Sequence, residues 1–169
     1  MKDNTKSLVV GALIAALYAG LTFMSNFFGL GYGPVQFRVS EALTVLPVFT
    51  PAAIWGVTVG CFISNIMSFN PVDMVFGTVA TLCAALLTYS LRNLRIKDFP
   101  LASVIMPVII NAAVVGAELV LFVSREGGFT AFLISALWIA ASEAVTCIGL
   151  GGLLFTAVKK NRKLRELFS

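Results

Sequence analysis

Long runs of apolar residues, separated by short polar or glycine-containing segments, dominate the sequence. A transmembrane helix needs about 20 residues of predominantly apolar character. Four of the six runs reach that length, whereas the second and the third are shorter. The runs lie at about 8–28, 39–50, 52–69, 72–91, 100–123 and 130–158. The pattern predicts an all-α integral membrane protein in which residues 1–169 form a single membrane domain.

The two short runs are separated by a break that contains Pro47 and Pro51. Proline lacks a backbone donor and clashes with the preceding turn, so a continuous helix is interrupted here. Residues 38–69 therefore form either one kinked span or a tight helical hairpin, which gives five or six helices in total.

Basic residues decide between these arrangements, because short cytoplasmic loops are enriched in Lys and Arg. Ten of the 12 Lys and Arg residues fall in three clusters: Lys2 and Lys6; Arg92, Arg95 and Lys97; and Lys159, Lys160, Arg162, Lys163 and Arg165. With six helices all three clusters lie inside, whereas with five the last two lie outside. We therefore predict a six-transmembrane-helix bundle with both termini cytoplasmic. The last cluster is expected to continue the sixth helix or to lie along anionic headgroups.

The composition excludes several classes of function. Hydrophobic residues make up 59% of the chain, charged residues 12%, and the mean hydropathy is +0.95, so lipid is the expected surrounding. The formal charge of +4 is concentrated in three short clusters, so no nucleic acid partner is expected. The chain has no His, and its three Cys lack metal-ligand spacing, so we expect neither a metal nor a cofactor.

No phosphate-binding loop motif is present, so the energy for any transport must come from a partner or an ion gradient. A membrane enzyme is disfavoured because the chain has no His, reactive Cys arrangement or metal motif.

Small residues recur on the first helix at a spacing of four. Ala12, Ala16 and Gly20 form one such series, and a second consists of Gly11, Ala15 and Ala19. Small residues at this spacing let another helix approach closely in lipid. This face either packs against a neighbouring helix of the same chain or docks a separate membrane subunit.

Four carboxylates lie within or at the edges of the apolar runs: Glu41, Asp73, Glu118 and Glu143. A charged side chain at the bilayer centre costs roughly 2.5 kcal/mol or more, so such groups face a bundle interior or a wet cavity. Arg38 is the basic residue in the outer half, and its spacing allows it to pair with Glu41. Asp73 can also be explained without a ligand, as an acid in the first turn of a helix whose N-cap is Asn70 and whose first residue is Pro71.

Other polar and aromatic side chains are predicted to lie near these acids. The amides are Asn65 and Asn111, and the sixth helix contributes Trp138 and Ser142; Tyr32 and Phe37 come from the loop at 28–37. That loop is either a lid or a plain interfacial turn. The aromatic rings either stack on a flat ligand or pack and anchor at the interface.

One guanidinium cannot neutralise Glu41, Glu118 and Glu143 together. Three explanations remain: protonated acids in a proton relay, a bound cation, or a ligand rich in N–H donors. A carboxylate accepts two parallel hydrogen bonds from a fork of N–H groups, which is the geometry of a guanine-like edge.

The run at 32–65, with Phe-Arg-Val-Ser-Glu-Ala-Leu at 37–43, closely resembles the queuosine-precursor transporter family. Its members are QueT-type substrate-binding (S) components of energy-coupling-factor (ECF) transporters. Segments 73–89, 108–119 and 136–145 fit the same family.

The resemblance implies a multi-pass subunit of a prokaryotic plasma membrane, without catalysis of its own. It would capture a 7-substituted 7-deazaguanine such as preQ1, preQ0 or queuine for ATP-driven uptake. Its partners would be a transmembrane coupling subunit, met through the Ala12-x-x-x-Ala16 spacing, and two cytoplasmic ATPases. The alternative is a stand-alone proton- or cation-coupled carrier of a purine-like or vitamin-like solute.

The resemblance also suggests roles for the site residues. One acid would read the N1–H and exocyclic amine of the base, and another would pair an aminomethyl cation where the ligand carries one. Asn111 would contact the six-position carbonyl side. Which acid has which role is left open at this point.

Overall fold

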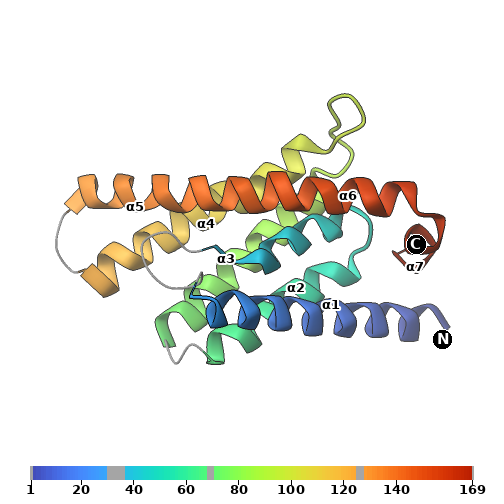
Figure 1. Ribbon diagram of the computed structural model, residues 1–169, viewed down its shortest axis with the longest axis horizontal. Coiled ribbons are helices and arrows are strands. Elements are labelled where there is room, and N and C mark those ends of the chain that lie inside the picture. Colours follow the sequence, from blue (N-terminus) through green and yellow to red (C-terminus); the bar gives the residue numbers. More distant parts are fainter. Residues whose placement is uncertain (1, 30–36, 68–70, 125–127, 169) are drawn as a thin grey trace.

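The computed structural model describes residues 2–29, 37–67, 71–124 and 128–168, and within these ranges the chain is mainly helical (Figure 1). The α-helices are α1 (Lys2–Phe27), α2 (Ala52–Met67), α3 (Pro71–Ser90), α4 (Leu101–Glu118), α5 (Gly128–Glu143), α6 (Gly151–Lys160) and α7 (Arg162–Phe168). A 3₁₀ helix, η1 (Val39–Val48), precedes α2, and π-helical segments follow α4 (η2, Leu119–Ser124) and α5 (η3, Ala144–Leu150).

The lengths of these helices confirm the contrast between long and short apolar runs. In the described chain, four helices are long and apolar enough to cross a membrane: Asn4–Phe27, Pro71–Ser90, Leu101–Phe122 and Gly128–Lys160. The shorter apolar helices are Val39–Val48 and Ala52–Ile66. Large apolar side chains such as Leu8, Val79 and Leu137 remain exposed, as expected of surfaces that face lipid.

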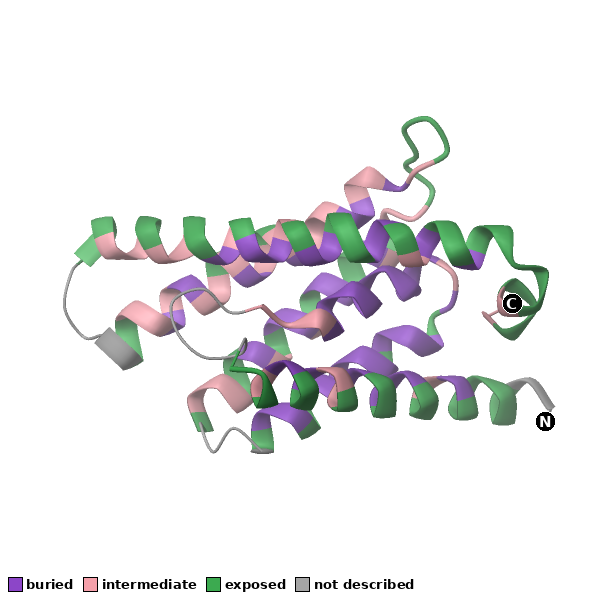
Figure 2. Cartoon of the chain, viewed as in Figure 1, coloured by how far each residue is buried: buried purple, intermediate pink, exposed green. Residues whose placement is uncertain are grey.

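The second apolar run forms the buried centre of the molecule. Figure 2 shows η1 in the middle of the bundle, and its residues Ser40–Val48 are all buried. Ten residues of 3₁₀ helix extend only about 20 Å at ~2.0 Å per residue. Pro47 within the element and Pro51 just after it prevent a regular α-helix across this stretch. The element packs against α1, α3, α6 and η3, so its polar side chains face other helices.

The first two α-helices approach closely because glycines line their contact. A Cβ atom at Gly56 would lie 2.8 Å from the Gly11 carbonyl oxygen, and one at Gly60 would lie 2.7 Å from the Tyr18 Cβ. Ala15 is buried in the same contact, whereas Ala12, Ala16 and Gly20 are exposed. The small residues of α1 thus divide between a side packed on α2 and an exposed side.

The basic tail does not continue the sixth helix in a straight line. The backbone is extended at Asn161, where α6 ends. The Asn161 side chain accepts a hydrogen bond from the Lys163 backbone amide at 3.0 Å and so caps the start of α7. The Phe168 ring stacks on the Phe49 ring with 6.4 Å between the ring centroids. Lys6 Nζ donates a hydrogen bond to the Glu166 carbonyl oxygen at 2.8 Å. The basic tail therefore does not continue the sixth helix, because apolar side chains of α7 fold back onto the bundle. The alternative, a position along anionic headgroups, stays a prediction.

Candidate functional site

Three elements bring a buried amide and two buried carboxylates together. Glu41 lies on η1, Asn111 on α4 and Glu143 at the end of α5, with exposed fractions of 2%, 5% and 9%. Asn111 Nδ2 donates to Glu143 Oε1 at 3.0 Å. The predicted convergence of these three residues is therefore present.

The Glu41 carboxylate is only half satisfied. The hydroxyl of Tyr18, which is fully buried on α1, donates to Oε1. Oε2 is buried and has no hydrogen-bond partner among the described residues, although the Asn111 amide lies near enough to interact more weakly. An unpaired buried carboxylate oxygen carries a large desolvation penalty, so this atom is poised to accept a donor.

The Glu143 carboxylate has a second neighbour in the π-helical segment. Cys147 Sγ lies 3.2 Å from Glu143 Oε2 and 3.7 Å from the Glu41 carbonyl oxygen. One ligand atom from each of Glu41, Glu143 and Cys147 falls within 4.8 Å of the others. Two charged carboxylates this close repel unless a proton, a cation or a donor-rich ligand lies between them.

A narrow cavity opens onto this cluster. It is lined by Arg38, Glu41, Gly77, Thr81, Asn111, Val115, Ile139, Ser142 and Glu143. The space available to the centre of a water-sized sphere is about 20 Å³, and a single water needs about 10–15 Å³ by that measure. A flat bicyclic ring therefore enters only if the lining helices move apart.

Arg38 pairs with a different acid from the one its spacing suggests. Its Nη2 lies 3.1 Å from Asp73 Oδ2. The Asp73 carbonyl in turn accepts a hydrogen bond from Asn65 Nδ2 at 3.0 Å. The i,i+3 spacing allows an Arg38–Glu41 pair, but in the structure Tyr18 takes that place beside Glu41.

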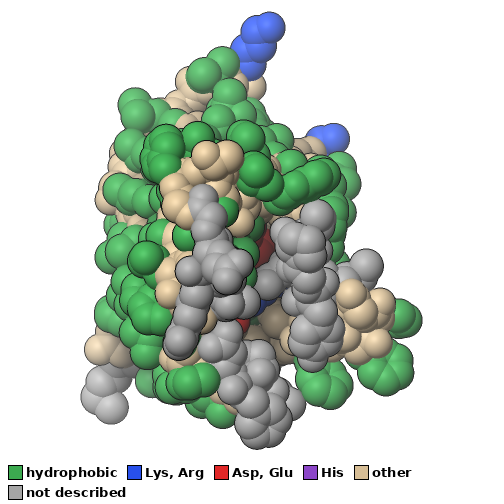
Figure 3. Space-filling view, turned by 90° about the vertical axis from the view of Figure 1, so that its left-hand side faces the viewer, with side chains coloured by type: hydrophobic (Ala, Val, Ile, Leu, Met, Phe, Trp, Pro, Cys, Tyr) green, Lys and Arg blue, Asp and Glu red, His purple; other side chains and the backbone are tan. Residues whose placement is uncertain are grey.

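Glu118 lies at the end of the bundle opposite the two termini, where α4 finishes. Its side chain is 3% exposed, and Oε2 is buried without a hydrogen-bond partner among the described residues. It interacts electrostatically with Asp73 and Arg38. Figure 3, which views this end, shows a few acidic and basic atoms near the centre of the face.

The three aromatic residues predicted for the site differ in their placement. Trp138 is 52% exposed, and its neighbour Ile139 lines the cavity instead, together with Ser142. Phe37 is partly buried just before η1, and Tyr32 lies outside the described residues. A ligand contact by these rings stays a prediction.

Sequence reasoning missed Tyr18, Thr81 and Cys147 as neighbours of the site. Tyr18 carried a usable signal, because it is a polar-tipped side chain inside an otherwise apolar helix and a buried tyrosine hydroxyl usually needs a partner. The sequence indicated Cys147 less clearly. It lies four residues after Glu143, on the same face of a helix, but an apolar helix often has a buried cysteine at such a position for packing alone.

Comparison with known proteins gives a consistent family. A family model described as QueT transporter matches residues 8–160. A curated relative from Lactococcus lactis subsp. cremoris (strain MG1363), "Queuosine precursor transporter QueT", is 44% identical over 81 residues. That alignment spans about half of each protein, 48% of this chain and 48% of the relative. No solved structure matches the chain. With the family model covering most of its length, the chain belongs to the QueT transporter family.

Proposed function

We propose that this protein captures a queuosine precursor, a 7-substituted 7-deazaguanine, and serves as the substrate-binding S component of an ECF transporter. The observation that carries the proposal is the convergence of Glu41 and Glu143 on Asn111, with Glu41 Oε2 left unpartnered in the described structure. The family assignment and the name of the relative support the same ligand class.

The chemistry of the cluster suits one edge of such a base. The N1–H and the exocyclic amine form a fork of donors, which a carboxylate binds through two parallel hydrogen bonds. Asn111 can donate to the carbonyl at position six, because an amide offers both a donor and an acceptor. Val115 and Ile139 supply apolar walls for the ring.

The proposed topology has six membrane crossings and both termini in the cytoplasm. The hydrogen bond between Lys6 and Glu166 ties the two ends of the chain together, which favours an even number of crossings. The basic clusters near these ends favour the cytoplasmic side. On this orientation Glu118, Asp73 and Arg38 lie toward the outside, where substrate arrives.

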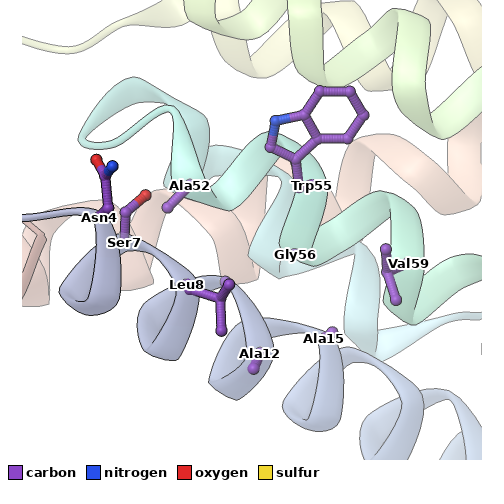
Figure 4. Close-up of a pocket in the computed structure, with 10 residues that line it drawn as sticks. Asn4, Ser7, Leu8, Ala12, Ala15, Ala52, Trp55, Gly56 and Val59 are labelled. Carbon is purple, nitrogen blue, oxygen red and sulfur yellow. The ribbon is translucent and has the colours of Figure 1, made fainter. Parts of the chain in front are cut away.

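The exposed small residues of α1 are the proposed docking side for a transmembrane coupling subunit. One of them, Ala12, lines a groove of about 520 Å³ between α1 and α2. The groove is lined by Asn4, Ser7, Leu8, Gly11, Ala12, Ala15, Ala52, Trp55, Gly56 and Val59 (Figure 4). A helix of the partner can approach closely over such a surface in lipid. Two cytoplasmic ATPases bound to that subunit would power release of the substrate, with no cofactor or catalysis in this chain.

Mass spectrometry of the small molecules that co-purify with the detergent-extracted protein tests the substrate class. Recovery of a 7-deazaguanine is expected, whereas recovery of an unrelated vitamin would overturn the assignment. Uptake of the labelled base by cells tests the mechanism. It is expected to stop when the ATPase subunits are inactivated by mutation.

One observation favours a second candidate, a proton- or cation-coupled carrier. Ligand atoms of Glu41, Glu143 and Cys147 lie within 4.8 Å of one another, close enough to share a proton or a cation. Uptake that persists without the ATPases and is abolished by an uncoupler would support the carrier and contradict the S-component proposal.

A further inference from the structure

The buried acids of the bundle form two levels along α4. Asn111 belongs to the inner level with Glu41 and Glu143, and Glu118 belongs to the outer level with Arg38 and Asp73. Seven residues separate Asn111 from Glu118, which places them about two turns, or ~10 Å, apart along the same side of the helix. Val115 lies between them and lines the cavity, so the cavity extends from the inner level toward the outer one.

The base that interacts with Glu118, Arg38, is already engaged by another acid. Arg38 already forms an ion pair with Asp73 at 3.1 Å, so one guanidinium stands beside two carboxylates. In the described part of the chain, the buried Oε2 of Glu118 has no hydrogen-bond donor. A buried ionised carboxylate that lacks a paired charge is strongly destabilising. A cation from outside the chain would remove that penalty.

The separation of the two levels matches the two ends of one ligand. Glu41 and Glu143 suit the neutral donor edge of the base, which leaves the position-7 substituent directed away from them. A hydrogen bond of about 2.8 Å at each end adds to the length of the ligand itself. Asn111, which bonds Glu143, and Glu118 lie about two helical turns apart on α4, and this spacing suits a bicyclic base with a short arm.

We propose that Glu118 binds a cationic arm at position 7 of the deazaguanine, so that the site selects an aminomethyl base over its neutral nitrile counterpart. The inference rests on the proposed function and adds the form of the substrate. Because Asp73 is already paired with Arg38, Glu118 is the acid of the outer level that the arm would meet. The inner level is indifferent to the arm, because it contacts only the ring edge.

Isothermal titration calorimetry with 7-aminomethyl-7-deazaguanine and 7-cyano-7-deazaguanine tests this assignment. Wild-type protein is expected to prefer the aminomethyl base. The substitution Glu118→Gln is expected to affect binding of the two bases to different extents. The loss of affinity for the aminomethyl base is expected to exceed the loss for the nitrile by at least about tenfold, because only the aminomethyl base loses a hydrogen bond between charged groups. Glu143→Gln is the matched acid-to-amide control, and it is expected to weaken both ligands by similar factors.

Equal losses for the two ligands in Glu118→Gln would overturn the role of Glu118 and leave the proposed function standing. Failure of wild-type protein to bind either base would overturn the proposed function itself. If Glu118→Gln does not fold, Glu118→Asp replaces it, because aspartate keeps the charge but withdraws it by one methylene. That variant is expected to narrow the preference for the aminomethyl base, and an unchanged preference would contradict the proposal.

Discussion

At the scale of single residues, the site is defined by polar groups whose partners come from distant parts of the chain. Asn111 bridges toward Glu143 from α4, while Tyr18 reaches Glu41 from α1. The sequence predicted the acids of the site, because a carboxylate within an apolar run is costly to bury and therefore needs a polar environment. It did not indicate that Arg38 pairs with Asp73, since that contact joins residues 35 positions apart.

Glu143→Gln is expected to weaken binding of a 7-deazaguanine by more than about 1.5 kcal/mol, the low end for a hydrogen bond to a charged group. Calorimetry on the detergent-solubilised protein measures the change. Glu166→Gln is the matched control, because Glu166 is an exposed acid on α7 that pairs with Arg162. Unchanged affinity in Glu143→Gln would remove Glu143 from the binding site.

Tyr18→Phe is expected to lower the free energy of unfolding by about 1–3 kcal/mol, because it leaves a buried carboxylate oxygen without its donor. Thermal unfolding in detergent is the measurement. Tyr89→Phe is the control, since its partly buried ring stacks under Arg92 and phenylalanine preserves that ring. Equal unfolding temperatures for the two variants would show that the Tyr18 hydroxyl contributes little.

At the scale of elements, the long apolar helices were predictable and the irregular ones were not. The predicted runs 72–91 and 100–123 lie close to the apolar helices Pro71–Ser90 and Leu101–Phe122, because a membrane demands long apolar segments. The 3₁₀ geometry of η1 depends on packing around Pro47 from several sides. The π-helical turn after Glu143 likewise has no clear signature in the local sequence.

The contact between α1 and α2 gives a prediction at this scale. Gly60→Ala is expected to destabilise the protein by about 1–3 kcal/mol through overpacking, because the new Cβ would lie 2.8 Å from the Ala15 carbonyl oxygen. Gly20→Ala is the control, since a Cβ there meets nothing within 4 Å. The measurement is the thermal unfolding temperature in detergent. An unfolding temperature that is no lower in Gly60→Ala than in Gly20→Ala would contradict the close approach of α1 and α2.

At the scale of the whole molecule, the all-α membrane architecture followed from the sequence, but the division of the small residues on α1 did not. The spacing alone made Gly11 and Ala12 equivalent, whereas the structure turns Gly11 toward Ala52 and leaves Ala12 exposed. The fold-back of α7 was also unforeseen, because it depends on a stacking partner, Phe49, far away in the sequence.

Ala16→Leu is expected to leave deazaguanine binding intact and to prevent assembly with the coupling subunit, because a bulky side chain blocks close helix approach. Co-purification with tagged coupling subunit is the measurement. Ala141→Leu, at an exposed alanine of α5, is the matched control and is expected to assemble normally. An intact complex with Ala16→Leu would place the docking side elsewhere.

The narrow cavity has a kinetic consequence. Because the space beside Glu41 and Glu143 accommodates about one water, we predict that the lining helices separate before the base binds. The observed association rate is then expected to level off at high base concentration, at the frequency with which the bundle opens. Stopped-flow mixing would reveal that ceiling, and a rate that rises linearly without limit would mean that the base meets a passage already wide enough to admit it.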